Sequence, residues 1–347
     1  MRFYNRQHQF YCGIDLHVKT MYICILDHTG QVRVHRNVPS TPEALLEVVA
    51  PYRDDVVVAA ECMFTWYWLA DVCAAEGITF VLGHALAMKA IHGGKAKNDK
   101  IDSQKIAGLL RGGLLPQAYV YPAAMRSTRD LLRRRLHLVR KRGQLLAHIQ
   151  NTRAQYQLPE FGRRLAYPGN RDGVVAHFPD PIVRKSIEVD VTLIDQYDAL
   201  VNDLELTIVR EAKRHDGDAF HRLRSVPGIG KVLALTIRYE IHDIHRFDRV
   251  QEFASYARLV KCQKQSGGRT LGTSGAKMGN VHLKWAFSEA AVLFLRHTKD
   301  GKKVLAVIMK KHGKGKALSI LAHKIGRAVY YMLARGTVFS MEKFLAA

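Results

Sequence analysis

Two acidic residues interrupt or end the apolar runs of the first 124 residues, which limits the folds open to this chain. Asp15 lies within the run Tyr-Cys-Gly-Ile-Asp-Leu at 11–16, and Glu61 directly follows the apolar run 56–60. A carboxylate in or against an apolar strand is unfavourable unless something pairs with it, and a metal ion is the simplest partner. The fold must therefore bring these acids to a place that a cation can reach.

The order of the surrounding patterns favours one fold class. Runs rich in β-branched or aromatic residues cover 11–16, 21–26 and 32–38, and Asp27-His28-Thr29-Gly30 indicates a hairpin turn between the last two. Further along, helices are expected from Thr41-Pro42-Glu43 onward, over 66–76 and over 99–111, with strands over 56–60 and 79–82. The order βββαβαβ followed by a helix predicts an α/β ribonuclease-H-like (RuvC-like) domain over residues 1–124.

Two more acids, Asp99 and Asp102, stand three residues apart at the start of the last of these helices, so they share one face. If the strands of Asp15 and Glu61 are neighbours and this helix packs across them, the four carboxylates can hold two divalent ions about 3.5–4 Å apart, the spacing used for in-line phosphoryl transfer. Alternatively, Asp99 and Asp102 are exposed acids favoured by the helix dipole. For all four acids together we favour a catalytic metal site that binds Mg²⁺ or Mn²⁺.

The charge balance indicates the partner. Lys plus Arg exceeds Asp plus Glu by 22, and such an excess repels itself unless a polyanion neutralises it, so nucleic acid is expected. No apolar run approaches the length of a membrane span, so no membrane partner is expected. The five cysteines form no CxxC pair and mostly fall in apolar runs, which is typical of reduced thiols in a cytoplasmic protein.

The composition changes near residue 125. Residues 126–153 carry nine Lys or Arg against one acid, with an apolar stripe at helical spacing, and a second apolar stripe follows over 187–208. Two such helices predict a helical hairpin or an intermolecular coiled coil over 125–217. The basic helix is either a connector with a solvated face or a nucleic-acid-binding stalk. The cations expected to bind nucleic acid are Arg133, Arg134, Arg135, Arg140, Lys141 and Arg142.

The last segment, 218–347, is predicted to be mainly helical. Its turn Val226-Pro227-Gly228-Ile229-Gly230-Lys231 is typical of a helix-hairpin-helix-like motif. Gly228 and Gly230 would let backbone N–H groups reach a DNA phosphate at a helix N-terminus, and Lys231 would add a positive charge. The alternative is an ordinary glycine turn between two packed helices.

A Gly-rich loop is expected over 266–279. Ser266 is flanked by glycines and by cations, so its hydroxyl can approach a phosphodiester closely while the charges stabilise the transition state. Ser-Gly-Gly is equally typical of a plain flexible loop, and Ser274 is an equally plausible hydroxyl on chemical grounds. The neighbouring cations Lys264, Arg269 and Lys277 are either phosphate-binding residues or solvated charges.

Short motifs occur in a fixed order along nearly the whole chain: Gly13-Ile14-Asp15, Ala60-Glu61, Lys97-Asn98-Asp99-Lys100-Ile101-Asp102-Ser103, Val226-Pro227-Gly228-Ile229-Gly230, Phe253-Ala254-Ser255-Tyr256-Ala257, Gln265-Ser266-Gly267-Gly268, and Lys277-Met278-Gly279-Asn280 with Leu283. In this order they resemble the insertion-sequence transposases that pair a RuvC-like DEDD domain with a C-terminal serine-bearing domain, the bridge-RNA-guided serine recombinases. The chain departs from that family at Cys62-Met63-Phe64, where small residues are usual, and at 257–262.

The resemblance implies that Ser266 attacks DNA and forms a covalent phosphoserine link, assisted by the DEDD metals of a partner protomer in a dimer or tetramer. It also implies a noncoding bridge RNA that pairs with donor and target DNA, and a location at the prokaryotic nucleoid. A RuvC-type, metal-dependent, structure-selective endonuclease that uses water as its nucleophile is the alternative. A non-catalytic nucleic-acid-binding protein is a third interpretation, which the intact acid set disfavours.

Overall fold

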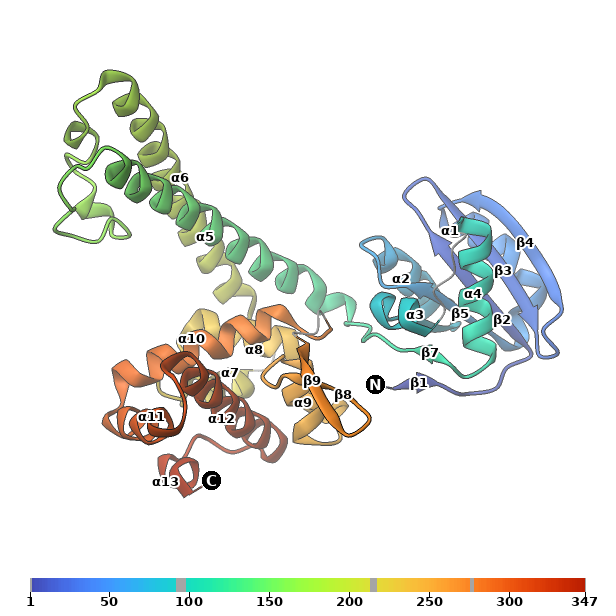
Figure 1. Cartoon of the computed structure of the whole chain (residues 1–347). Coiled ribbons are helices and arrows are strands. Elements are labelled where there is room, and N and C mark those ends of the chain that lie inside the picture. Colours follow the sequence, from blue (N-terminus) through green and yellow to red (C-terminus); the bar gives the residue numbers. More distant parts are fainter. Residues whose placement is uncertain (1, 92–97, 213–216, 275–277, 347) are drawn as a thin grey trace. The chain divides into compact units, whose positions relative to one another are not determined.

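The computed structural model describes residues 2–91, 98–212, 217–274 and 278–346 and divides into two compact units, Met1–Ala124 and Met125–Ala347 (Figure 1). The division at 124/125 coincides with the change in composition. A further boundary at 217/218 remains a prediction.

A five-stranded mixed sheet with the strand order β4-β3-β2-β5-β6 forms the centre of the first unit. The antiparallel strands β2, β3 and β4 continue on the other side of β2 into the parallel strands β5 and β6. This topology fits the predicted ribonuclease-H-like class. The strands span Phe10–Leu16 (β2), Thr20–Asp27 (β3), Val32–Pro39 (β4), Val56–Glu61 (β5) and Thr79–Gly83 (β6), and the two-residue strands β1 (Phe3–Tyr4) and β7 (Leu115–Pro116) pair separately.

Helices cover both faces of this sheet. Alternate side chains of β2 and β5 divide between two cores: Ile14 and Val58 pack with residues of α1 and α2, whereas Tyr11 and Val57 pack with residues of α4. The side chain of Thr41 caps α1 at the helix start that the sequence predicted, while α3 was not anticipated. The helices span Pro42–Val49 (α1), Trp66–Ala75 (α2), Ala85–Ile91 (α3) and Asp99–Arg111 (α4), with a 3-10 turn at Ala50–Asp55.

Helix α4 crosses β2 at Gly13, where only a glycine fits. A Cβ atom at Gly13 would lie 2.3 Å from the backbone nitrogen of Ala107 and 2.3 Å from the carbonyl oxygen of Ser103. Neither backbone atom can move without shifting α4. The missing side chain therefore sets how closely α4, with its two acids, approaches the strand that carries Asp15.

We expect Gly13→Ala to lower the free energy of unfolding by about 1–3 kcal/mol, because the added methyl group overpacks a backbone contact. Gly108→Ala on the same helix is the matched control, since a Cβ there meets nothing within 4 Å. The control should be neutral or slightly stabilising, because alanine has the higher helix propensity. Chemical denaturation of both variants measures the difference, and equal stabilities would contradict the close-packing argument.

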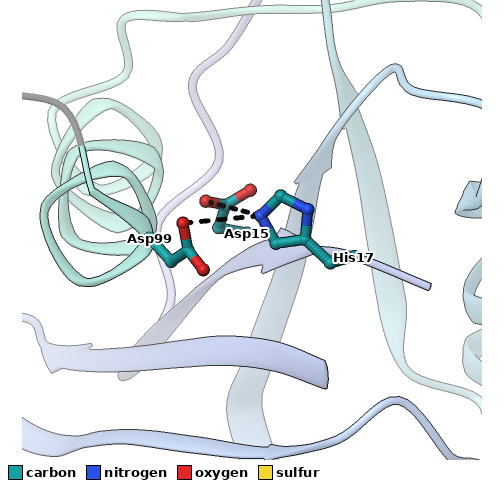
Figure 2. Close-up of side chains that lie close together, drawn as sticks. All are labelled: Asp15, His17 and Asp99. Atoms are coloured by element: carbon teal, nitrogen blue, oxygen red, sulfur yellow. Dashed lines mark ion pairs between the residues drawn. The ribbon is translucent and has the colours of Figure 1, made fainter. Parts of the chain in front are cut away.

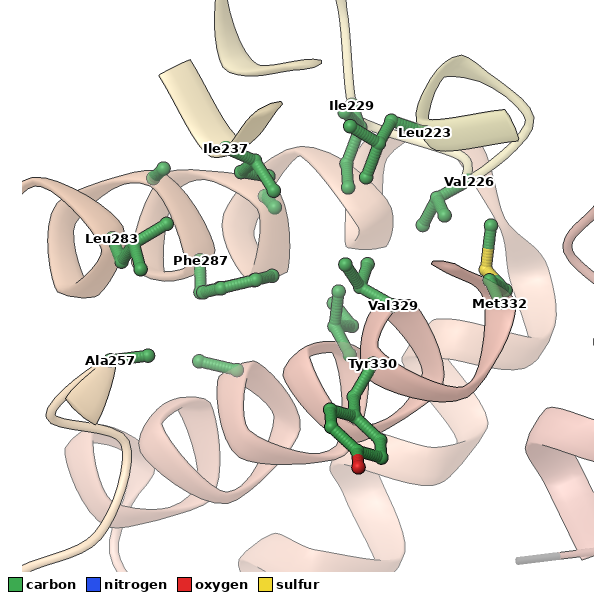
Figure 3. Packing of buried hydrophobic residues seen from close by; sticks show 14 of the residues in the cluster. Leu223, Val226, Ile229, Ile237, Ala257, Leu283, Phe287, Val329, Tyr330 and Met332 are labelled. Carbon is green, nitrogen blue, oxygen red and sulfur yellow. The ribbon is translucent and has the colours of Figure 1, made fainter. Parts of the chain in front are cut away.

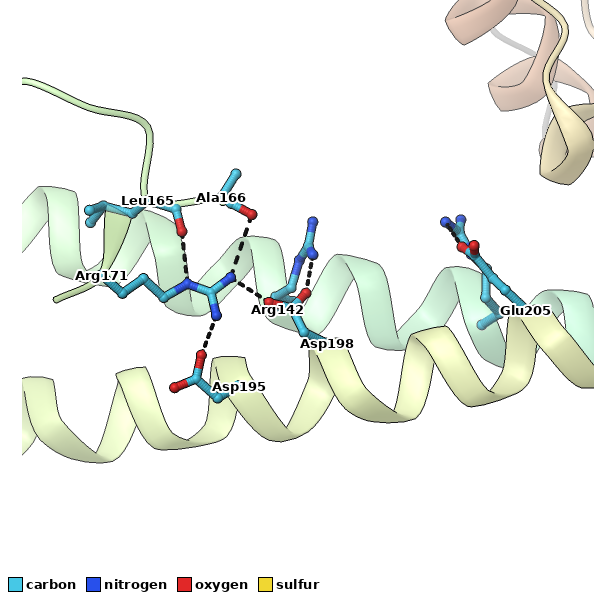
Figure 4. Close-up of polar contacts among 8 residues, drawn as sticks. Arg142, Leu165, Ala166, Arg171, Asp195, Asp198 and Glu205 are labelled. Carbon is cyan, nitrogen blue, oxygen red and sulfur yellow. Dashed lines mark hydrogen bonds and ion pairs between the residues drawn. The ribbon is translucent and has the colours of Figure 1, made fainter. Parts of the chain in front are cut away.

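The second unit begins with a long helical hairpin, one of the two arrangements that the sequence left open. Helix α5 (Ala123–Gln155) and helix α6 (Pro181–Ala212) lie side by side within one chain (Figure 1). Ion pairs connect α5 to α6, and Arg171 of the connecting segment joins the same network (Figure 4). The pairs are Arg135–Glu205, Arg142–Asp198, His148–Asp190, Arg171–Asp195 and Arg171–Asp198.

Between these helices the chain forms short 3-10 turns at Pro168–Asn170 and Val175–His177 around a small core that includes Phe178 and Ile194. The looser structure agrees with the prolines and glycines of this stretch, which interrupt helical hydrogen bonding.

The rest of the second unit is mainly helical, as predicted, around a core to which α8, α10 and α12 contribute, for example Ile237, Phe287 and Val329 (Figure 3). No helix among the described residues is long and apolar enough to cross a membrane. The helices span Gly217–Arg224 (α7), Lys231–Ile241 (α8), Val250–Tyr256 (α9), Val281–His297 (α10), Lys299–Lys311 (α11), Lys314–Arg335 (α12) and Met341–Ala346 (α13), with a 3-10 turn at Ile244–Arg246.

A buried carboxylate ties three helices of this unit together. Glu240 on α8 is 2% exposed and accepts hydrogen bonds from Arg129 Nε at 3.1 Å and from Arg133 Nε at 2.7 Å, both on α5. It also accepts from Asn280 Nδ2 at 2.7 Å. Asn280 caps the N-terminus of α10, because its side-chain oxygen accepts from the backbone N–H groups of His282 and Leu283. The base of the hairpin is thereby fixed to the helical core.

The expected loop over 266–279 is wrong in its first half. Strands β8 (Cys262–Ser266) and β9 (Arg269–Ser274) form an antiparallel hairpin there. The two-residue turn consists of Gly267 and Gly268, with φ values of 56° and 75°. Two successive positive φ values are what a tight hairpin turn of the primed type requires, and glycine adopts them without strain.

Candidate active site

The sheet places Asp15 and Glu61 side by side. Strands β2 and β5 are parallel neighbours, and their register pairs Ile14 with Ala60. Asp15 and Glu61 are the next residues along each strand, at the carboxyl ends, where the side chains of parallel strands meet at one edge. Both belong to the same alternating set as Tyr11 and Val57, which faces α4. The predicted adjacency therefore follows from the strand order and the register.

The N-terminus of α4 adds the second pair of acids. Asn98 caps this helix: its side-chain oxygen accepts a hydrogen bond from the Ile101 N–H at 2.8 Å. Asp99 and Asp102 lie in the first turn, where the helix dipole favours negative charge. Asp102 also accepts a hydrogen bond from Lys105 Nζ at 3.3 Å.

A histidine that the sequence analysis did not single out, His17, lies close to two of these acids. His17 Nε2 lies 3.5 Å from Asp15 Oδ2 and 3.5 Å from Asp99 Oδ1 (Figure 2). One ligand atom from each of these three residues lies within 4.8 Å of the others, a spacing that suits a single metal ion. Glu61 and Asp102 fall outside this set of three. The only sequence signal for His17 is its position two residues after Asp15, which puts it on the same side of the chain.

The electrostatics of the cluster favour a cation. Burial raises the pKa of Asp15, and the nearby carboxylates of Asp99 and Asp102 raise it further, whereas His17 lowers it. The ionised form of Asp15 is therefore disfavoured unless positive charge is supplied. Carboxylate oxygens are ligands that Mg²⁺ and Mn²⁺ accept. An imidazole nitrogen is better suited to softer divalent ions than Mg²⁺.

Ser266 lies at the tip of the β8–β9 hairpin in the second unit. It is exposed and stands directly opposite Arg269 across the Gly267-Gly268 turn. The strand register therefore pairs an exposed hydroxyl residue with an exposed arginine. The turn is a defined structure and not an unstructured loop.

Comparison with known proteins identifies the chain. A family model described as "Transposase", for the DEDD domain of IS110 elements, matches residues 12–157, and one described as "Transposase IS116/IS110/IS902 family" matches residues 220–306. The chain is an insertion-sequence transposase of the IS110 family. The first match contains the acid cluster, which comprises Asp15, Glu61, Asp99 and Asp102, and the second match contains the serine hairpin.

Full-length relatives agree with this assignment. The transposase for insertion sequence element IS1111A of Coxiella burnetii is 24% identical over 93% of this chain and 89% of its own length. A putative transposase, y4qE, of Sinorhizobium fredii is 25% identical over 94% of this chain and 82% of its own length. Transposases act on DNA, and the DEDD domain suggests that this one uses a divalent metal.

Half of the cations predicted on α5 of the transposase are engaged within the chain. Arg133 bonds to Glu240, Arg135 to Glu205 and Arg142 to Asp198. The other three predicted residues, Arg134, Arg140 and Lys141, are exposed. A helical pattern shows which residues share a face but not which acids of a distant helix will meet them. Binding of nucleic acid by any of the six remains a prediction.

The turn between α7 and α8 serves packing at one of its glycines. Gly228 has a φ of 87°, and a Cβ there would lie 2.4 Å from the backbone nitrogen of Phe294 on α10. Gly230 is the N-cap of α8, and its surroundings are open. An open pocket beside the turn is also lined by Arg224 and His297, and Lys231 at the helix start is exposed. Packing thus explains Gly228, and phosphate binding at the turn remains a prediction.

Two of the three remaining predicted cations lie on the strands of the serine hairpin. Lys264 is on β8 and Arg269 is on β9, where it is exposed, whereas Lys277 lies outside the described residues. Their contacts with phosphate also remain predictions.

Proposed function

We propose that this transposase cuts and rejoins DNA strands through a covalent link to Ser266, with the DEDD acids holding the divalent metal that assists. The observation that carries the proposal is the placement of Ser266, which is exposed at the tip of a tight hairpin and paired with Arg269. A hydroxyl nucleophile needs access to phosphorus and a nearby positive charge, and this position offers both.

The chemistry balances without an external energy source. The Ser266 oxygen forms a bond to phosphorus, the bond from phosphorus to the 3′ oxygen of the cut strand breaks, and that oxygen takes up the proton lost by serine. In the second step a strand's 3′ hydroxyl attacks the 5′-phosphoserine, which releases Ser266 and restores a phosphodiester. One phosphodiester is consumed and one is formed, so the reaction is an exchange.

The acids have a separate task. Asp15, Glu61, Asp99 and Asp102 would hold Mg²⁺ or Mn²⁺, and His17 lies close enough to join them. A bound divalent ion supplies positive charge to the phosphoryl oxygens during exchange. The chain's own contribution is to orient the carboxylates at one edge of the sheet, with the capped helix α4 packed against β2.

The proposal includes partners beyond donor and target DNA. We propose that the acids of one protomer act with Ser266 of another in a dimer or tetramer, and that a noncoding guide RNA pairs with both DNAs. The exposed cations Arg134, Arg140 and Lys141 would contact the phosphates of that RNA. Co-purification of a specific noncoding RNA with the transposase tests the guide directly.

The serine assignment predicts a covalent adduct that Ser266→Ala abolishes. Purified transposase is incubated with labelled element-end DNA and Mg²⁺, and adducts are resolved by denaturing electrophoresis. Ser274→Ala is the matched control and should retain the adduct, because it removes the other candidate hydroxyl of the same hairpin. An adduct that persists in Ser266→Ala, or vanishes only in Ser274→Ala, would refute the assignment.

A metal-dependent endonuclease that uses water as its nucleophile is the second candidate. One observation favours it: Asp15, His17 and Asp99 assemble within a single unit of the chain. Its products would carry free 5′-phosphate and 3′-hydroxyl ends with no protein attached, so the adduct experiment separates the two candidates.

A further inference from the structure

The turn that follows Glu61 exposes an aromatic ring. Phe64 shows 78% of its surface, the largest exposed fraction of any large apolar side chain among the described residues of the first unit. Its neighbour Met63 is 47% exposed. An exposed apolar ring forgoes the gain in free energy that burial would bring.

The turn is held in place on both sides of Phe64. The N–H of Cys62 donates to the carbonyl oxygen of Gly83 at 2.9 Å, and the hydroxyl of Thr65 donates to the carbonyl oxygen of Leu16 at 3.2 Å. After the turn, α2 begins with Trp66, which is only 5% exposed. Phe64 is therefore displayed from an anchored turn.

The anchor ties the turn to a backbone position next to the acids in sequence. Leu16, which accepts the hydrogen bond from Thr65, lies between Asp15 and His17 in sequence. On the other side, Glu61 is only three residues before Phe64. A strand whose phosphate reaches the acid cluster would thus bring its neighbouring nucleotides within range of the ring.

We propose that Phe64 stacks on a base of the DNA strand whose phosphodiester lies at the acid cluster. The inference rests on the proposed function, in which these acids act on DNA. A nucleotide combines a phosphate that a metal at the acids would attract with a flat apolar base that a phenyl ring can cover. A protein partner would instead have to bury the acids beside the ring, among them Asp99, whose side chain is 55% exposed, at a large desolvation cost.

Binding of single-stranded DNA by the full-length transposase tests the proposal, with Ca²⁺ replacing Mg²⁺ to prevent cleavage. Fluorescence anisotropy at fixed salt compares oligo-dT of about 20 nucleotides with an abasic strand of equal length. Phe64→Ala should bind oligo-dT roughly 5- to 100-fold more weakly, as expected for the loss of one stacked base. It should bind the abasic strand as the unmodified protein does, and Phe64→Tyr should restore binding to oligo-dT.

Leu114→Ala is the control for loss of an exposed apolar side chain. Leu114 is 54% exposed and lies just after the C-terminal end of α4, whereas Asp99 lies at the N-terminal end. Its replacement should therefore leave both affinities unchanged. The proposal would be overturned if Phe64→Ala weakened binding to the abasic strand as much as binding to oligo-dT, or if it left binding to oligo-dT unaltered. Oligo-rU of the same length is a third probe, and a loss of binding confined to oligo-rU would also overturn the proposal, because it would assign the ring to RNA. Because no cleavage is measured, failure here is distinguishable from failure of the serine chemistry.

Discussion

Replacing Asp15 by Asn is expected to slow DNA strand cleavage by about 1000-fold. The carboxylate lies at the centre of the acid cluster, next to Glu61 in register and close to His17. Loss of one charged metal ligand removes several kcal/mol of transition-state stabilisation, and each 1.36 kcal/mol corresponds to a factor of ten in rate. Single-turnover cleavage of element-end DNA in Mg²⁺ measures the change, and an undiminished rate would exclude a metal role for Asp15.

The same substitution should not damage the fold. Burial and the neighbouring acids raise the pKa of Asp15 above its unfolded value, so its ionised form at neutral pH opposes folding. The Asp15→Asn variant lacks that charge, and without metal it should be as stable as the unmodified protein or slightly more so. Added Mg²⁺ should raise the thermal midpoint of the unmodified protein more than that of the variant. An ion that binds the folded state stabilises that state more when it binds more tightly, and the variant lacks one of the carboxylates.

Replacing Glu240 by Ala is expected to lower the free energy of unfolding of the second unit by about 3–5 kcal/mol. The substitution leaves the nearly buried guanidinium of Arg129 and part of that of Arg133 without their acceptor, and breaking a buried ion pair is far costlier than breaking an exposed one. Glu188→Ala, which breaks an exposed pair with Lys185, should cost less than about 1 kcal/mol. Urea denaturation followed by circular dichroism compares the two, and equal losses would contradict a structural role for Glu240.

Glu240 also predicts an acid-sensitive contribution to stability. Burial opposes its ionised form, but hydrogen bonds and charge from Arg133 and Arg129 outweigh burial and lower the pKa of Glu240 to about 2 from the usual 4.5. Because the folded pKa lies below the unfolded one, this stabilisation is complete above about pH 4.5 and is lost as the pH falls toward 2. Glu240→Gln should flatten the stability profile in that window.

The sheet of the first unit could be predicted from sequence because its strands are short apolar runs bounded by turn residues. The expected strands at 11–16, 21–26 and 56–60 differ from β2, β3 and β5 by one residue at one or both ends. Adjacency of Asp15 and Glu61 was predictable only on condition that their strands were neighbours, because strand order depends on contacts between distant segments. His17 was missed because, apart from its position two residues after Asp15, nothing distinguishes it from the other sixteen histidines.

The β8–β9 hairpin was missed for a physical reason. Its strands are mostly polar, so the alternation of apolar and polar side chains that marks a half-buried strand is absent. The turn residues Gly267 and Gly268 were visible in the sequence but were read as a sign of flexibility. Likewise, the charges of α5 gave no sign that Glu205, Asp198 and Glu240 would pair with half of the predicted cations.

Those ion pairs limit how strongly the affinity of the helical hairpin for nucleic acid can depend on salt. Neutralising phosphates releases condensed counterions. Each cation that contacts a phosphate makes the slope of log affinity against log salt more negative by roughly 0.7 to 0.9. With Arg133, Arg135 and Arg142 already neutralised by acids of the same chain, the six predicted cations contribute through Arg134, Arg140 and Lys141 alone. If each of these three binds one phosphate, together they account for a slope of about −2 to −3, roughly half of what all six predicted cations would give.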